Sequence, residues 1–139
     1  MRRLTRPPRP VVSATVNETS EPSITQEEIS NGRLIAAVSY LPGLCFIGLL
    51  GFPENRYTVF HARQGFVLFL VEIVVAIAFG IFDASLGRIP WVGLILGAIL
   101  KFVVWIGLLI VTVYGVAKGA SGELVRVPFL GEAADKVPF

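Results

Sequence analysis

Three long apolar stretches, separated by short polar segments, make up most of the chain after its first thirty residues. They cover about residues 34–52, 65–86 and 90–117. A helix needs about 20 mostly apolar residues to cross a bilayer, so each stretch is long enough for one transmembrane helix. The pattern predicts an all-α integral membrane protein with three transmembrane helices, whose two termini lie on opposite sides of the membrane.

The third stretch is long enough to raise the alternative of four helices, with a turn near Lys101. No Pro or Asn lies between Pro90 and Lys118 to make that turn, and half of the stretch would be too short to span. We therefore expect one long helix that tilts or extends beyond the bilayer.

The first stretch contains Pro42 and Gly43 in its interior. Proline removes a backbone hydrogen bond, so the first transmembrane helix is expected to kink there, with its break facing protein rather than lipid. Before this stretch, Ser23 or Thr25 can act as the N-cap of a short interfacial helix over about residues 25–31.

The two ends of the chain differ in composition from the apolar stretches. Residues 1–23 are rich in Pro, Arg, Ser and Thr and lack the continuous apolar run of an export signal. We interpret them as a basic, Pro-rich tail that is disordered or ordered by a partner. Residues 24–139 form one helical membrane domain, whose last segment, 124–139, is expected to lie at the membrane interface.

Composition supports the membrane assignment. Hydrophobic residues make up 54% of the 139 residues and charged residues 16%, against roughly 25% charged in soluble domains. The net charge is only +2 and the basic residues are scattered, which argues against nucleic-acid binding. The one cysteine, Cys45, lies in an apolar run without a metal-binding pattern. No metal or cofactor is expected.

Two charged residues, Glu72 and Lys101, lie inside the second and third apolar stretches. Both lie 14 residues from a turn at Leu86 and Gly87, so an antiparallel hairpin closing there places them at equal depth. A charge in mid-bilayer costs about 2.5–3.5 kcal/mol on insertion scales, so neither should face lipid. We expect a buried ion pair; the alternatives are a proton or ion relay, or pairing with another subunit.

Small residues at helix-packing spacing occur twice in the third stretch. Gly93 and Gly97 form one G-x-x-x-G pattern, and Gly115 and Gly119 form another. Such pairs let two helix backbones approach closely, so they are candidate helix-packing sites.

Before the second stretch, the polar residues of "TVFHARQGF" include the only histidine of the chain, His61. Tyr57, His61 and Gln64 lie near one face of a helix because they are four and three residues apart. No hydrolase or metalloprotease motif accompanies the histidine. We therefore predict no catalytic site, and interpret His61 as a membrane-rim residue that bonds to nearby loop backbone. A pH-sensing role is the alternative.

Three segments resemble a bacterial family of small membrane proteins that is related to the chloroplast import component Tic-twenty and includes magnetosome proteins of the MamF type. They read "AAVSYLPG", "ENRYTVFHARQG" and "GASGELVRVPFLGEAADKV". Residues that fit the family pattern are Ser39, Asn55, Phe60, His61, Ala62, Gln64, Gly122, Arg126, Pro128 and Gly131. The chain has Gly65 where the family usually has alanine. The resemblance implies a helical membrane protein without known enzymatic activity.

These observations predict a non-enzymatic accessory or scaffold subunit of a larger membrane assembly, or a homo-oligomer. The alternative, which the import relative implies, is a transport component that lines a protein-conducting or ion path. Expected partners are the lipid bilayer and other membrane subunits or copies of the chain, with the N-terminal tail contacting one of them. We expect the bacterial cytoplasmic membrane, with the 53–64 loop and the C-terminus on the cytoplasmic side.

Overall fold

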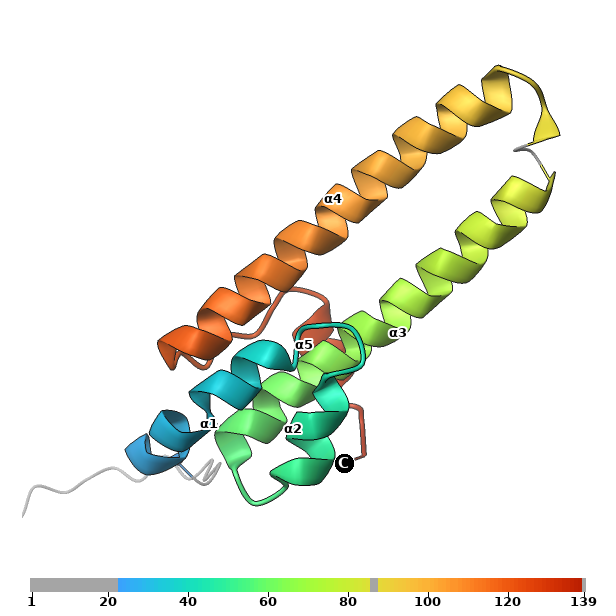
Figure 1. The fold of residues 1–139 in the computed structure, drawn as a ribbon. Helices are drawn as coiled ribbons and strands as arrows, with labels where there is room; N and C mark the ends of the chain where they lie inside the picture. The colour runs from blue at the N-terminus through green and yellow to red at the C-terminus, as the bar shows by residue number, and fades with distance from the viewer. Residues whose placement is uncertain (1–22, 86–87, 139) are drawn as a thin grey trace, which may run out of the picture.

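A computed structural model describes residues 23–85 and 88–138, which form five α-helices (Figure 1). The helices are α1 (Gln26–Val38), α2 (Cys45–Gly51), α3 (Arg56–Ser85), α4 (Val92–Ser121) and α5 (Leu130–Ala134). The long helices α3 and α4 run antiparallel, and the three short helices gather at one end of this hairpin (Figure 1). We call that end, residues 24–68 and 115–137, the head. Apart from Ser23, the N-terminal tail lies outside the described residues.

Thr25 and Glu28 fix the start of helix α1. The side chain of Thr25 accepts a hydrogen bond from the Glu28 amide at 3.2 Å, and the Glu28 carboxylate accepts one from the Thr25 amide at 2.8 Å. This reciprocal capping box satisfies amides that a helix N-terminus otherwise leaves unpaired. Thr25 is therefore the cap, and the helix extends beyond the predicted residues 25–31 to Val38.

The first predicted transmembrane helix, about residues 34–52, is not present as one helix. The segment forms the end of α1 and the whole of α2, which have 13 and 7 residues and are too short to span. Pro42 has no amide to continue α1, and Gly43 has a positive φ of 77°, which favours glycine. The predicted kink is a complete reversal of the chain.

The reversal returns the chain to the level at which α1 began. The Asn55 side-chain amide donates to the Glu28 carbonyl oxygen at 2.8 Å, so the start of α3 lies beside the first turn of α1. Figure 1 shows α1 and α2 as the two arms of a short helical hairpin against α3. The predicted topology with termini on opposite sides is therefore corrected: both ends of the described chain lie at the head.

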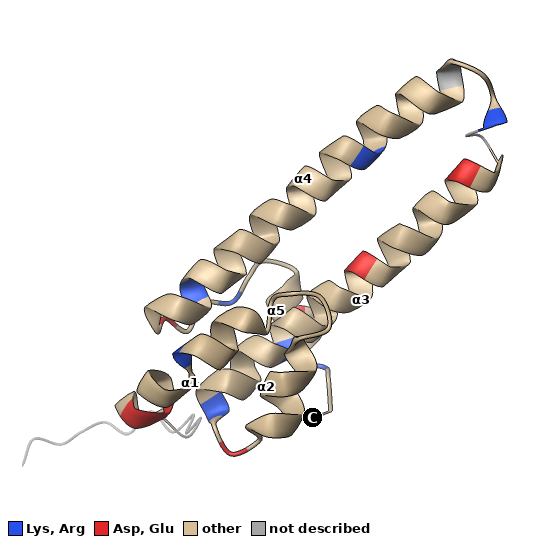
Figure 2. Cartoon of the chain, viewed as in Figure 1, with Lys and Arg blue, Asp and Glu red and all other residues tan. Residues whose placement is uncertain are grey.

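Helices α3 and α4 are both long and apolar enough to cross a membrane. Helix α4 is one continuous helix of 30 residues, as expected for the third stretch. At 1.5 Å per residue it is about 45 Å long, which exceeds a hydrocarbon layer of about 30 Å. Figure 2 shows only a few charged residues along the hairpin, whereas most charges gather at the head.

Small residues hold the head together. A side chain at Gly119 would meet the backbone of Ala36 and Ala37 in α1 at 2.9–3.1 Å, and one at Gly115 would collide with the Tyr40 ring. A side chain at Gly65 would collide with the Ser39 carbonyl oxygen. Glycine at these positions lets α1 and the turn after it lie directly on α3 and α4.

Candidate functional site

The first three turns of α3 carry a row of buried polar side chains. Tyr57, Thr58 and His61 are fully buried, and Gln64 is 1% exposed. Their spacing places them near one side of the helix, which faces α1 and the C-terminal end of α4. Together with Asn55 we call them the polar clamp, because each bonds to the backbone of another segment.

Two residues of the clamp fix α1 against α3. Asn55 donates to the Glu28 carbonyl, while its side-chain oxygen accepts from the Thr58 amide at 2.9 Å. The Thr58 hydroxyl donates to the Gly32 carbonyl of α1 at 3.4 Å. Asn55 thus caps the start of α3 and holds α1 at the same time.

Tyr57 holds the end of α4. Its hydroxyl donates to the Gly119 carbonyl at 2.8 Å, and Lys118 offers a longer acceptor at 3.4 Å. The last carbonyls of a helix have no partner within the helix. Tyr57 supplies one from α3, just before the C-cap residue of α4, Gly122, whose φ is 85°.

His61 bridges two segments with its two ring nitrogens. Nε2 lies 3.1 Å from the Glu123 carbonyl oxygen, and Nδ1 lies 3.0 Å from the Tyr40 hydroxyl. A carbonyl only accepts, so Nε2 carries the hydrogen, and Nδ1 accepts from Tyr40 in the neutral ring. Both nitrogens of this buried imidazole are thereby engaged within the protein.

Gln64 completes the clamp on the segment that follows α4. Its side chain donates to the Val125 carbonyl at 3.3 Å and accepts from the Val127 amide at 2.9 Å. Residues 123–127 have no regular secondary structure, so their backbone groups need partners from elsewhere. His61 and Gln64 provide them and fix this segment along α3.

The other residues of the family pattern lie around the clamp. Phe60 is half-buried, Arg126 forms a 3.2 Å ion pair with Asp135, and Pro128 is exposed just before α5. No group of three or more His, Cys, Asp or Glu residues that could hold a metal ion occurs among residues 23–85 and 88–138. The sequence did not single out Tyr40 or Thr58, whose partners are brought together only by the chain reversal.

The predicted ion pair between Glu72 and Lys101 is wrong. Lys101 instead bonds both carboxylate oxygens of Asp83 at 2.7 Å. Because α3 ends at Ser85 and α4 begins at Val92, Lys101 lies opposite about residue 76, roughly one helical turn from Glu72. The flexible lysine reaches toward the tip of the hairpin, where water is closer. The predicted turn at Leu86 and Gly87 lies outside the described residues.

The two glycine pairs have different surroundings. Gly115 and Gly119 pack on Tyr40, Ala36 and Ala37 of the head, as described above. In the outer part of the hairpin, a side chain at Gly97 would meet the Phe82 ring at 2.9 Å. Gly93 is also buried. The residues that pack on Gly97, Gly115 and Gly119 all belong to the same chain as these glycines.

A pocket lies beside α3, between α2 and α5, and sequence reasoning did not find it. Its volume is about 500 Å³, and its lining includes three arginines, Arg56, Arg63 and Arg126. Arg126 lies 63 residues after Arg63 and 70 after Arg56 in the sequence, so no local motif signals the site. Phe60 and Gln64 of the family pattern also line it.

The sequence is similar to three magnetosome proteins. MamF of Paramagnetospirillum magneticum is 32% identical over 98 residues, which are 70% of this chain and 78% of that protein. MamF of Magnetospirillum gryphiswaldense is 44% identical over 45 residues, which are 32% of this chain and 40% of that protein. MmsF of P. magneticum is 38% identical over 45 residues, which are 32% and 42% of the two chains.

No protein-family model and no solved structure matches the chain. The relation to the chloroplast import component is untested and stays a prediction. The similarity to MamF covers more than two thirds of both chains and agrees with the two long apolar helices of the structure. The chain therefore belongs to the MamF/MmsF family of magnetosome membrane proteins.

Proposed function

We propose that this chain is a non-enzymatic accessory or scaffold subunit of a larger membrane assembly, built from other subunits or from copies of itself. We place it in a bacterial membrane, either the cytoplasmic membrane or a magnetosome membrane such as its relatives are named for. The hairpin of α3 and α4 spans the layer, and the head carries the re-entrant pair α1 and α2.

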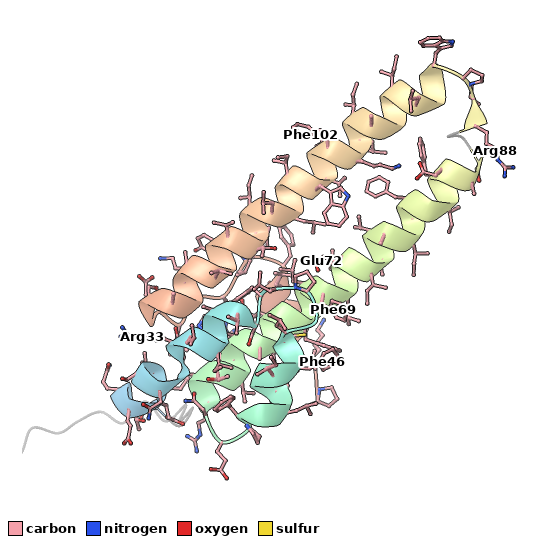
Figure 3. The ribbon with its side chains drawn as sticks, viewed as in Figure 1. Arg33, Phe46, Phe69, Glu72, Arg88 and Phe102 are labelled. Atoms are coloured by element: carbon pink, nitrogen blue, oxygen red, sulfur yellow. The ribbon has the colours of Figure 1, made fainter. Side chains whose placement is uncertain are left out.

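The observation that carries this proposal is Glu72. It lies within the apolar part of α3, just beyond the head (Figure 3), and forms no ion pair among the described residues. A charge at the middle of a bilayer costs about 2.5–3.5 kcal/mol on insertion scales, and charged residues within the apolar layer seldom face lipid at any depth. A polar or cationic group on a neighbouring subunit removes that cost. Glu72 therefore marks a face that is completed by assembly.

The polar clamp supports a non-enzymatic role. The side chains of Asn55, Tyr57, His61 and Gln64 bond to backbone groups of the same chain. His61 is also tied to Tyr40 and is fully buried. A general acid or base must reach the atom that it protonates or deprotonates, and these contacts already occupy both ring nitrogens. We therefore assign the clamp to holding the fold.

The chain reversal also strengthens the proposed orientation, with the head on the cytoplasmic side. Six Lys and Arg residues lie at the head, namely Arg33, Arg56, Arg63, Lys118, Arg126 and Lys136. At the opposite end, among the described residues, only Arg88 is basic; Figure 3 shows Arg33 and Arg88 at the two ends. Cytoplasmic flanks of transmembrane helices carry the excess of basic residues.

Native mass spectrometry of the particle extracted in mild detergent tests this function. The wild-type chain should be present at fixed stoichiometry with other subunits or further copies. Glu72→Gln, which keeps the shape but removes the charge, should shift the particle toward the single chain. Glu132→Gln is the matched control, because Glu132 is exposed in α5 outside the spanning helices.

Two results would contradict the proposal: a wild-type single chain that retains bound lipid, or a Glu72→Gln particle identical to the wild type. A homo-oligomer that conducts ions, and whose conductance falls in Glu72→Gln, would favour the transport alternative. Cysteine accessibility from the two sides of sealed vesicles tests the orientation separately, with single cysteines in place of Lys136 and Arg88.

A further inference from the structure

The pocket between α2, α3 and α5 has the size and lining of a ligand site. Its volume of about 500 Å³ falls within the range of about 300–1,000 Å³ that is typical of small-molecule sites. The pocket and the polar clamp lie on different sides of the same part of α3. Gln64 is the one side chain that belongs to both.

The charges that line the pocket select an anion. Arg56, Arg63 and Arg126 contribute three positive charges, and Asp135 contributes one negative charge, which leaves a net charge of +2. Arg126 and Asp135 form an exposed ion pair at 3.2 Å, so Asp135 neutralises one arginine only in part. Guanidinium groups bind phosphate and carboxylate oxygens with paired hydrogen bonds, and phosphate is the one of these groups that every phospholipid headgroup carries.

Arg63 gives a second, independent indication of a ligand. Its Nε atom is a buried side-chain nitrogen with no hydrogen-bond partner among the described residues. A buried, unpaired donor on a charged group is costly, and most such groups in folded proteins have a partner. Because this atom is shielded from solvent, a rotation of the flexible Arg63 side chain toward a bound phosphate oxygen would give it that partner.

Apart from Gln64, the rest of the lining is apolar. The apolar residues are Leu49 of α2, Val59 and Phe60 of α3, Ala134 of α5, and Ile24 and Pro53. The pocket therefore combines arginines with a surface suited to glycerol or acyl carbons. It also lies at the head, where the spanning helices leave the membrane and lipid headgroups are found.

From these observations we propose that the pocket binds the phosphate headgroup of an anionic phospholipid, with Arg56, Arg63 and Arg126 contacting the phosphate. Binding there would fix the lipid between α2 and α5 and join the C-terminal segment to the membrane surface. The same phosphate chemistry exists in inorganic phosphate, which serves as the competing probe. This proposal does not require that the chain assembles with other subunits, because the test measures the number of lipids bound to each chain.

Native mass spectrometry of delipidated full-length protein tests this site, by titration with phosphatidylglycerol or phosphatidylcholine in detergent. One phosphatidylglycerol per chain should bind at least about tenfold more tightly than phosphatidylcholine. Arg63→Gln and Arg56→Gln should each weaken that binding about tenfold or more. Arg88→Gln, an equal change of charge at the far end of the hairpin, should leave it unchanged.

Asp135→Asn provides a variant in which binding should increase, a result that misfolding cannot produce. This change removes the acid that competes for Arg126, so binding of phosphatidylglycerol should become tighter. Equal affinity for the two lipids, or equal weakening by Arg88→Gln and Arg63→Gln, would overturn the site. If an equal concentration of inorganic phosphate displaces the lipid, the ligand of the pocket is soluble phosphate and the lipid proposal is refuted.

Discussion

The bond between Tyr40 and His61 allows a quantitative test of the polar clamp. Both side chains are buried, and the hydroxyl donates to Nδ1 at 3.0 Å. Tyr40→Phe removes the donor and leaves Nδ1 unpaired, which should cost about 1–3 kcal/mol of unfolding free energy. His61→Phe keeps a ring but leaves both the Tyr40 hydroxyl and the Glu123 carbonyl unpaired, so it should cost more.

The double variant distinguishes this bond from ordinary packing. With Phe at both positions, only the Glu123 carbonyl remains unpaired, so the two costs should not add. We expect the double variant to be about 1–3 kcal/mol more stable than the sum of the single losses predicts. The measurement is reversible unfolding of the four proteins in mixed micelles of fixed composition.

A matched control separates this effect from a general loss of tyrosine hydroxyls. Tyr114 lies on α4 and is 41% exposed, so Tyr114→Phe should change stability by less than about 0.5 kcal/mol. Costs of Tyr40→Phe and His61→Phe that add within about 0.5 kcal/mol would refute the reasoning. The hydrogen bond would then contribute nothing beyond the packing of the two rings.

Three further predictions follow from other parts of the fold. Gly119→Ala places a methyl group against the backbone of α1 and should lower the free energy of unfolding by about 1–3 kcal/mol. Gly107→Ala, which lies in open space on the same helix, should be neutral or stabilising. Thermal unfolding of both variants in the same detergent compares them. The pKa of Glu28 lies below its ordinary value of 4.5, chiefly because the amide of the cap residue bonds its carboxylate. The stabilisation from Glu28 is therefore present above pH 4.5 and lost as the pH falls through the lowered pKa, so melting temperatures measured down to about pH 3 should show a smaller acid loss in Glu28→Gln. Asp83→Lys should destabilise the hairpin and Lys101→Asp in the same chain should restore it in thermal unfolding; if the double variant is no more stable than Asp83→Lys alone, the pairing is refuted.

The sequence pattern predicted the long helices correctly because their signal is local. Apolar runs of sufficient length without Pro or Asn produced α3 and α4, and Thr25 was one of two predicted caps of α1. The four-and-three spacing of Tyr57, His61 and Gln64 also placed these residues near one side of α3. Apart from the Tyr40 hydroxyl, their partners are backbone atoms of residues 119–127, and a backbone group has no residue-type signal.

The wrong partner of Lys101 and the missed arginine pocket have a common physical origin. Both depend on how helices are placed relative to one another, which the hydropathy pattern does not contain. The pairing of Lys101 depended on the length of the connection after Ser85, which shifts the register of α4 by several residues. The arginine pocket depended on α5 folding back beside α3, so that arginines 63 and 70 positions apart line one space. Neither a register nor a fold-back is encoded in the composition of a single stretch.

The largest correction comes from Pro42 and Gly43, and it changes the topology as well as one helix. A kink would have carried residues 34–52 across the membrane and separated Arg33 from Arg56. The left-handed Gly43 reverses the chain instead, and Asn55 then bonds to the first turn of α1. Arg33, which a three-span topology separates from Arg56, therefore lies with it at the head, whereas Arg88 stays at the opposite end. One dipeptide thus sets the number of helices that are long enough to span, and through it the charge asymmetry on which the proposed orientation rests.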